Sequence, residues 1–425
     1  MLSLRFKKGI LVTKVHYFLQ HTELLPYISC FANTLCKKKL PWYQIRHSAF
    51  DSSIENCCGK LFYSRTGRNP HDKYKNDTAP LHVQFSTKNS AQHGDAIEFV
   101  KTTDSSNIKF KVVDSYQKGS KHFTKLTAQF RFGKAYGDET FFATYWKPGK
   151  GHHILKGSIN ALIFISHGYG EYLGESYDEV ARLWSSKVGG GCLVFGHDHV
   201  GHGRTTAGER VFVNEMEEFI DPIIAHVEEV QKWNNGGGGK LPIFLVGHSM
   251  GGLISILILL KKQNLFNGFI GIGPLVMIGP DRATPTNKFL ASCIQSYFPR
   301  FTLPSFMDSN DDNHITRNKA FVEKIEKDPL RWHGGPKART GWLLLQSCEV
   351  VQTNLPKITL PLLILQGEKD KLVDTAGTKM IYENTSSNDK EYKVYSGAFH
   401  QLLIELDDVK FDVHMKTLKW MNERL

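Results

Sequence analysis

Short runs of consecutive apolar residues recur along this chain, separated by longer stretches of mixed polarity. Continuous apolar character, as opposed to alternation, predicts strands that are covered on both faces, as in a parallel sheet. Two earlier stretches, residues 128–132 and 140–146, predict antiparallel strands. The continuous runs lie at residues 161–166, 192–195, 243–246, 268–273 and 360–366. Residues 392–395, in which Lys393 interrupts the apolar residues, predict a further strand. We therefore predict an α/β fold with a mostly parallel central sheet and helices on both faces.

Residues 275–350 interrupt this alternation, and an excursion of that length predicts an inserted helical cap. The cap is richer in large apolar residues than a surface insertion needs, and about half of them are expected to pack it onto the core. The others predict a lid that contacts an acyl chain and a bilayer surface. The residues concerned are Phe289, Leu290, Cys293, Ile294, Tyr297, Phe298, Phe301, Leu303 and Phe306.

Residues 1–120 differ from the rest of the chain in charge. They contain 18 Lys or Arg residues against 9 Asp or Glu residues and so hold most of the net charge of +11. Their first 20 residues mix basic and apolar residues without acidic ones, as mitochondrial presequences do. We expect residues 1–120 to be a basic extension, disordered or used for targeting, and residues 121–425 to form the folded domain.

Composition limits the compartment and the partners. No apolar run reaches the 18 or so residues of a membrane-spanning helix, so membrane contact is expected to be peripheral. The seven cysteines are an odd number without zinc-site spacing, which suits a reducing compartment. We expect a cytoplasmic protein that associates peripherally with membranes, with mitochondrial import as the alternative. No nucleic acid and no cofactor is expected, and a homo-oligomer is compatible with the sequence.

The sequence around Ser249 predicts a catalytic nucleophile. An apolar strand leads into Gly-His-Ser-Met-Gly at residues 247–251, and an apolar helix follows. This is the nucleophile elbow of an α/β-hydrolase, in which a strained turn presents a serine hydroxyl. Glycines flank the serine because a Cβ there would collide with the neighbouring strand or helix. An ordinary serine in a glycine-rich turn is the alternative.

The remaining members of a catalytic triad should follow in the order acid, then histidine. Asp370 lies in a turn directly after the apolar run 360–366, and we prefer it to Glu368 and Asp374. His400 lies just past the last predicted strand. It would accept the proton of Ser249 and return it to the leaving alcohol, while the acid holds the imidazole.

The oxyanion hole should combine two backbone amides. The motif His-Gly-Tyr-Gly-Glu at residues 167–171 follows an early strand, as the loop that supplies the first amide does. We assign the amides of Tyr169 and Met250. Each such donor contributes about 3 to 4 kcal/mol in the transition state.

A cluster at residues 197–199, His197-Asp198-His199, together with His202, invites a metal interpretation. Its spacing is not the helical arrangement of a zinc hydrolase, and neutral imidazoles in a tight loop need no ion. We therefore expect no metal site and interpret this segment as a structural loop bordering the active site.

Several of these segments together resemble the monoglyceride lipase family of serine hydrolases. The resemblance begins near residue 123 and covers about 300 residues of the chain. It is carried by residues 167–171, 196–203, 247–252, 273–276, 316–319 and 365–370.

The resemblance implies an activity and a set of site residues. It implies hydrolysis of monoacylglycerols to free fatty acid and glycerol through an acyl-enzyme, with Ser249, Asp370 and His400 as the triad. It also implies Glu171 and His248 as substrate-binding residues, a lid over an acyl tunnel, and loose attachment to membranes.

Three departures from the family concern the head-group side of the site. The family usually has a small residue where Tyr169 stands, an arginine where this chain carries Glu175, and a second histidine where it carries Leu403. A lysophospholipase or an acyltransferase acting on other single-chain lipid esters is therefore the alternative function. A binding module without catalysis is a further alternative, but the intact order of the triad argues against it.

Overall fold

The computed structural model of the chain describes residues 96–97, 109–114, 117–118, 121–130, 132, 139–149, 159–233, 239–278, 284–303 and 314–425. All of these residues belong to one compact unit, Ala79–Leu425. Of the expected basic extension, residues 1–95 lie outside the described residues.

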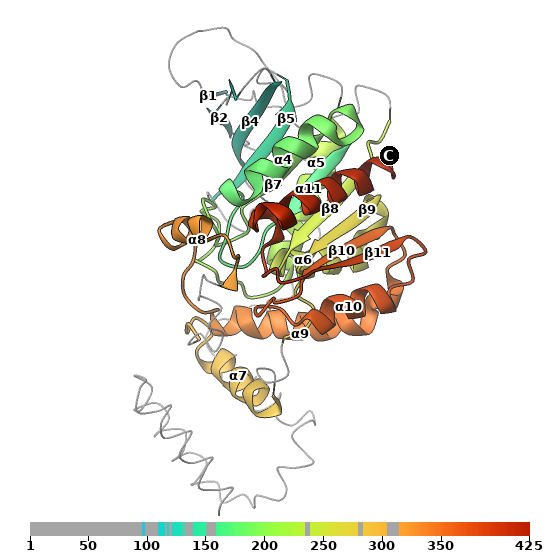
Figure 1. Cartoon of the computed structure of the whole chain (residues 1–425). Helices are drawn as coiled ribbons and strands as arrows, with labels where there is room; N and C mark the ends of the chain where they lie inside the picture. Colours follow the sequence, from blue (N-terminus) through green and yellow to red (C-terminus); the bar gives the residue numbers. More distant parts are fainter. Residues whose placement is uncertain are drawn as a thin grey trace, which may run out of the picture. The chain divides into compact units, whose positions relative to one another are not determined.

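The described residues contain an eleven-stranded sheet and eight helices (Figure 1). The strands are β1 (Ala96–Ile97), β2 (Lys109–Asp114), β3 (Gln117–Lys118), β4 (Lys121–Phe130), β5 (Phe141–Pro148), β6 (Leu162–Ser166), β7 (Leu193–His197), β8 (Ile243–His248), β9 (Gly268–Ile272), β10 (Leu362–Gly367) and β11 (Lys390–Tyr395). The helices are α4 (Glu175–Lys187), α5 (Glu217–Trp233), α6 (Met250–Lys262), α7 (Pro285–Tyr297), α8 (Lys319–Glu326), α9 (Ala338–Asn354), α10 (Thr375–Asn384) and α11 (Asp407–Asn422).

The strand order is β1-β2-β4-β5-β7-β6-β8-β9-β10-β11, with β3 paired to β4. Strands β7, β6, β8, β9, β10 and β11 are parallel, whereas β5 joins them antiparallel. The carboxyl ends of parallel strands meet at one edge of the sheet, so the loops after β6, β8, β10 and β11 converge there. The predicted α/β fold with a mostly parallel sheet is confirmed.

The sheet reaches further toward the N-terminus than expected. The antiparallel strand expected at residues 128–132 is β4, which begins at Lys121 and pairs with β2 and β5. Strands β1, β2 and β3 all lie within residues 1–120, for which no ordered element was expected. Two of them have only two residues each, too few for any periodicity to predict.

Helices cover both faces of the sheet (Figure 1). Helices α4 and α11 share an apolar cluster with one face, in which Trp184 and Trp420 are buried. Trp184 Nε1 also donates to Thr417 Oγ1 at 3.0 Å, which joins the two helices. Helices α5, α6, α9 and α10 contribute to the cluster on the opposite face. Strands β6 to β10 between them are buried on both sides, as the continuous apolar runs indicate, whereas the edge strand β11 is only partly buried.

The predicted cap, residues 275–350, contains α7, α8 and most of α9. Helix α9 also belongs to the core, because Leu344, Cys348 and Val351 pack in the cluster around α6. Helix α7 instead leaves Phe289 and Tyr297 68% and 60% exposed. Phe306 lies outside the described residues. No helix in the described part of the chain is long and apolar enough to cross a membrane.

Candidate active site

Ser249 lies on the turn that joins β8 to α6. Its backbone has φ 53° and ψ −121°, a left-handed conformation that is strained for a residue with a side chain. The turn is held from β9 and the segment after it: the Ser249 amide donates to the Ile272 carbonyl at 3.1 Å, and its own carbonyl accepts from Leu275 at 2.9 Å. Strain imposed in this way is typical of a serine that must present its hydroxyl.

Glycines allow the close packing around this turn. A Cβ at Gly251 would lie 2.1 Å from the Ser166 carbonyl oxygen, and a Cβ at Gly247 would lie 2.5 Å from Ser255 Oγ. Both separations are far below van der Waals contact, so only glycine fits. The first turn of α6 therefore lies directly against the end of β6, where the predicted oxyanion loop begins.

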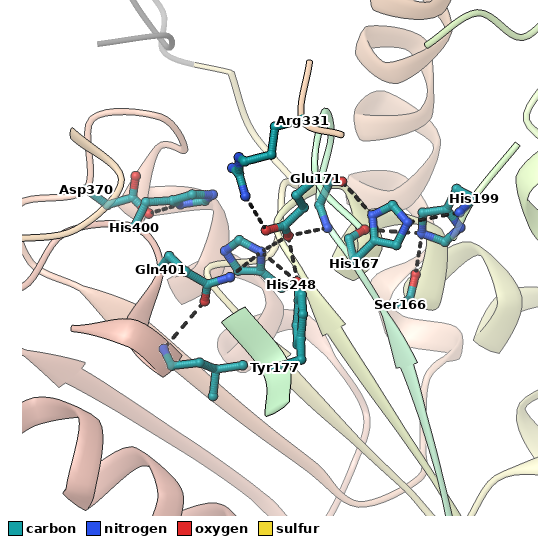
Figure 2. Close-up of polar contacts among 12 residues, drawn as sticks. Ser166, His167, Glu171, Tyr177, His199, His248, Arg331, Asp370, His400 and Gln401 are labelled. Atoms are coloured by element: carbon teal, nitrogen blue, oxygen red, sulfur yellow. Dashed lines mark hydrogen bonds and ion pairs between the residues drawn. The ribbon is translucent and has the colours of Figure 1, made fainter. Parts of the chain in front are cut away.

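Asp370 and His400 are brought together by the loops after β10 and β11. His400 Nδ1 lies 2.7 Å from Asp370 Oδ2, and both side chains are buried (Figure 2). Gln366 Nε2 donates to the same carboxylate oxygen at 2.9 Å. The other oxygen accepts from the amides of Leu372 and Val373 at 2.8 and 3.0 Å. These bonds fix the carboxylate and, through it, the imidazole.

Burial and charge act in opposite directions on this pair. Burial alone would lower the pKa of His400, but the Asp370 carboxylate raises it above its ordinary value. Burial alone would raise the pKa of Asp370, but His400 lowers it. At neutral pH the aspartate is therefore ionised, and it stabilises the imidazolium that forms when His400 accepts a proton.

Ser249 and His400 are connected through the residues beside them. The rings of His248 and His400 lie 4.8 Å apart between centroids. Gly273, which follows the strand that holds the Ser249 amide, packs against His400, since a Cβ there would lie 3.2 Å from His400 Nδ1. No hydrogen bond joins the Ser249 hydroxyl to His400 among the described residues. Such bonds are often long in free enzymes and tighten with substrate.

The predicted oxyanion donors lie on the two segments that meet at Ser249. Met250 is the first residue of α6, so its amide has no acceptor within the helix. Tyr169 follows Gly168, at which a Cβ would lie 3.2 Å from the Ser249 Cβ. In the part of the chain that the structure describes, neither amide donates a hydrogen bond to the protein.

Glu171 is the centre of a buried network beside the nucleophile (Figure 2). Its Oε1 accepts from the Gly168 amide at 2.6 Å and from the Tyr177 hydroxyl at 2.6 Å. The same oxygen lies 2.7 Å from His248 Nδ1, which also contacts Gln401 Nε2 at 3.1 Å. Burial alone would raise the pKa of Glu171, but His248 and then Arg331 hold it well below its usual range.

This network changes the expected role of Glu171. The sequence predicted that Glu171 and His248 contact the substrate, but both are buried and bonded to protein groups. The pKa of His248 is lowered by burial, against the effect of Glu171, so its ring is neutral and donates to the carboxylate. In these contacts Glu171 holds the Gly168 loop and His248, and direct contact of Glu171 with substrate stays a prediction.

The three departures on the head-group side lie in different surroundings. Tyr169 packs against the His202 ring at 5.6 Å between centroids. Glu175 begins α4 and pairs with Lys324 at the surface. Leu403 is buried in the cluster between the sheet and α11. An arginine does reach this region, but from the cap and not from position 175. It is Arg331, whose Nη1 lies 3.5 Å from Glu171 Oε2.

Four residues that contact the predicted site residues were not predicted from the sequence. Gln366 could have been found, because it is the last residue of the predicted run 360–366 and lies near the end of β10, four residues before Asp370. Tyr177 and Gln401 are close in sequence to Glu171 and His400, but no motif included them. Arg331 carried no signal, because it reaches Glu171 across 160 positions of sequence.

The histidine cluster forms a hydrogen-bonded loop beside the site. The His199 amide donates to His167 Nε2 at 2.9 Å, and His167 Nδ1 lies 2.8 Å from the Gly168 carbonyl oxygen. His202 Nδ1 lies 2.9 Å from the Val200 carbonyl oxygen. Burial lowers the pKa of His167 to about 4 and that of His202 to about 3, so both are neutral. Within the described ranges, no group of side chains could hold a metal ion.

Comparisons with known proteins agree with this geometry. Residues 157–407 match the family described as serine aminopeptidase, S33. The monoglyceride lipase of Mus musculus is 38% identical over 284 residues, which are 67% of this chain and 87% of the mouse protein. A monoglyceride lipase homolog of Monkeypox virus is 33% identical over 288 residues, or 68% of this chain and 96% of the viral protein.

Solved structures share the fold. A soluble variant of monoglyceride lipase from Saccharomyces cerevisiae, in complex with a substrate analog, superposes with a TM-score of 0.59 at 23% identity, covering 70% of this chain and 94% of that one. The Paleococcus ferrophilus monoacylglycerol lipase gives a TM-score of 0.55 at 21% identity, covering 67% and 99%. At these low sequence identities, the structural similarity shows that the fold is shared and nothing more.

Proposed function

Because this chain belongs to the monoglyceride lipase family, we propose that it hydrolyses monoacylglycerols to a free fatty acid and glycerol. The observation that carries the proposal is the strained turn at Ser249, which lies beside the buried pair of Asp370 and His400. Strain, order along the chain and the paired carboxylate are together what an acyl-transfer nucleophile requires.

The geometry supports a two-step acyl transfer. Ser249 Oγ attacks the ester carbonyl while His400 accepts its proton, and Asp370 stabilises the resulting imidazolium. The negative charge that develops on the carbonyl oxygen is stabilised by the amides of Tyr169 and Met250. His400 then protonates the leaving glycerol oxygen, and a water molecule, activated by the same imidazole, hydrolyses the acyl-enzyme.

The first test is release of fatty acid from 2-monoacylglycerol and, in parallel, from lysophosphatidylcholine. Ser249→Ala should lower release from the glycerol ester by about 10⁴-fold or more, since the nucleophile is lost. Ser186→Ala is the matched control, because Ser186 is an exposed serine that bonds only to carbonyls of its own helix. Release from the phospholipid alone, or release that survives in Ser249→Ala, would refute the proposal.

We also propose that the protein is cytoplasmic and contacts membranes peripherally through α7. Support comes from the exposure of Phe289, Leu290 and Tyr297 on this helix. Such an apolar surface suits the interface at which single-chain lipid esters reside. The three cysteines within the described ranges are unpaired, which suits a reducing compartment. Cell fractionation that placed the protein in mitochondria would contradict this location.

A further inference from the structure

We propose that the cap segment Asp328–Gly335 is a positioning element of the oxyanion hole. This inference rests on the proposed acyl transfer at Ser249 and adds a requirement to it. The loop that carries the Tyr169 amide would hold its active arrangement only while this segment is bound to it.

Four consecutive residues of the loop contact the segment one after another. The Tyr169 hydroxyl donates to the Gly335 carbonyl at 3.4 Å, and the Trp332 amide donates to the Gly170 carbonyl at 2.8 Å. Two side-chain contacts follow. Arg331 Nη1 donates to Glu171 Oε2 at 3.5 Å, and the Tyr172 hydroxyl donates to Asp328 Oδ2 at 2.7 Å.

The Tyr169 amide lies between two points at which the loop is held by hydrogen bonds. Before Tyr169 the chain is held from within the core, since the Gly168 amide donates to Glu171 Oε1 at 2.6 Å. After Tyr169 the chain is held from the cap, through the Gly170 carbonyl and the Trp332 amide. The direction of the Tyr169 amide therefore depends on both anchors, and the outer one belongs to the cap.

The close approach of the two segments depends on a glycine. Gly170 has φ +74°, and a Cβ there would lie 3.0 Å from the Trp332 carbonyl oxygen. Any side chain at this position would be strained and would also push the cap segment away.

The cap segment has its own internal order, so it can act as a fixed support. Asp328 Oδ1 accepts from the Leu330 amide at 2.9 Å, and the Asp328 carbonyl accepts from the Arg331 amide at 3.2 Å. Trp332 Nε1 donates to the Gly335 carbonyl at 2.9 Å. Asp328 thus joins the turn of the segment to the Tyr172 hydroxyl.

Catalysis should be sensitive to these contacts because oxyanion donors act only when they are already aimed at the developing charge. A shift of about 1 Å in a positioning group can cost about 10²-fold in rate. Loss of the outer anchor should therefore lower kcat and leave KM nearly unchanged, since the donors act in the transition state.

The test uses the double variant Tyr172→Phe/Arg331→Met, which removes two polar contacts and retains both side-chain stems. Two substrates are compared, a monoacylglycerol and the small ester p-nitrophenyl butyrate, together with binding of an aliphatic trifluoromethyl ketone. Ser249 Oγ adds to the ketone carbon, its proton passes to His400, and the former carbonyl oxygen becomes an oxyanion. The ketone therefore reports on the oxyanion hole directly.

We expect kcat to fall about tenfold or more on both esters, with KM within twofold, and the inhibition constant of the ketone to rise by a similar factor. Lys324→Met is the matched control, because it breaks the exposed pair with Glu175 and leaves residues 169–172 untouched. Its kcat should equal that of the wild type.

Three results would overturn the inference: an unchanged kcat in the double variant, unchanged ketone binding, or a loss confined to the lipid substrate. A lower melting temperature with normal kcat would show a purely structural contact. If the double variant fails to fold, kcat and ketone binding are measured on the single variant Tyr172→Phe, since this change removes only one oxygen atom. Wild-type protein that cleaves p-nitrophenyl butyrate but no monoacylglycerol would refute the proposed function and leave this test intact.

Discussion

At the scale of single residues, two carboxylate–histidine pairs lie beside Ser249 and are tuned in opposite directions. Asp370 raises the pKa of His400 despite burial, whereas burial outweighs Glu171 at His248 and lowers the pKa there. Pairs whose surroundings separate their pKa values take different roles in catalysis. His400 is thus poised to accept a proton, while His248 stays neutral and serves as a hydrogen-bond donor.

The raised pKa of His400 predicts the pH dependence of the rate. The base must be neutral to act, so kcat/KM should rise about tenfold per pH unit until the pH passes a value above 6.5, and then level off. Asp370→Asn removes the group that raises this pKa, so the rising limb should move to lower pH and kcat should fall about 10⁴-fold. Steady-state kinetics between pH 5 and 9 measure the position of the rising limb and kcat for the wild type and for Asp370→Asn.

Glu368→Gln is the control for this experiment. Glu368 is an exposed acid on the same turn and bonds only to Ser396 and Gly397. The Glu368→Gln variant should leave the rising limb of the pH profile and kcat unchanged. A large loss of kcat in this variant would mean that the acid of the triad has been misassigned.

The residues of the site differed in how far the sequence could predict them. Ser249, Asp370 and His400 could be chosen because each follows a strand at the same edge of a parallel sheet, in a fixed order. The surroundings of Glu171 could not, because Arg331 reaches it across 160 positions of sequence. Such a contact depends on how the cap packs, and no local pattern records that packing.

At the scale of elements, the buried strands were the most predictable part of the fold. The runs at residues 243–246 and 360–366 correspond to β8 (Ile243–His248) and β10 (Leu362–Gly367), which are buried along their whole length. Strands at the antiparallel end were predicted less well, and β4 begins seven residues earlier than expected. Continuous apolar runs mark strands covered on both faces, and short or one-sided strands lack that signal.

Helix α7 has the apolar exposure that a membrane-contacting element needs. Each large aromatic side chain buried in a bilayer interface contributes about 1.5 to 3 kcal/mol. Phe289→Ser/Tyr297→Ser should therefore weaken binding to phosphatidylcholine vesicles at least tenfold in a sedimentation assay, with hydrolysis of p-nitrophenyl butyrate unchanged.

A matched control exists on another helix. Phe411 of α11 is 67% exposed, much like Phe289. If Phe411→Ser weakens vesicle binding as much as the α7 variant does, general hydrophobicity is responsible and α7 has no special role.

At the scale of the whole molecule, buried neutral histidines should make the fold sensitive to acid. Burial lowers the pKa of His167 to about 4 and those of His202 and His226 to about 3. The unfolded chain protonates these groups near pH 6.5, so it binds more protons than the folded one below that value. Stability must then rise with pH in this range, and it is lost as the pH falls toward the folded pKa values. His400 opposes this effect, because its pKa is raised.

The expected loss is about 1.4 kcal/mol per histidine and per pH unit below 6.5. Urea unfolding at pH 7.5, 6.5 and 5.5 measures it as a change in the free energy of unfolding. His202→Gln, which removes one titrating ring, should reduce the slope by about one proton. A free energy of unfolding that is flat between pH 6.5 and 5.5 would show that these rings can take up protons in the folded state.

The pairing of α4 with α11 has a consequence for how the chain is made. Trp184 and Thr417 are 233 residues apart in sequence, so a ribosome must add all of the intervening residues before α4 can be covered. The growing chain would already contain Ser249, Asp370 and His400 while the part of the sheet face that α11 covers is still exposed. During synthesis, that exposed part of the face is the surface that chaperones would be expected to bind.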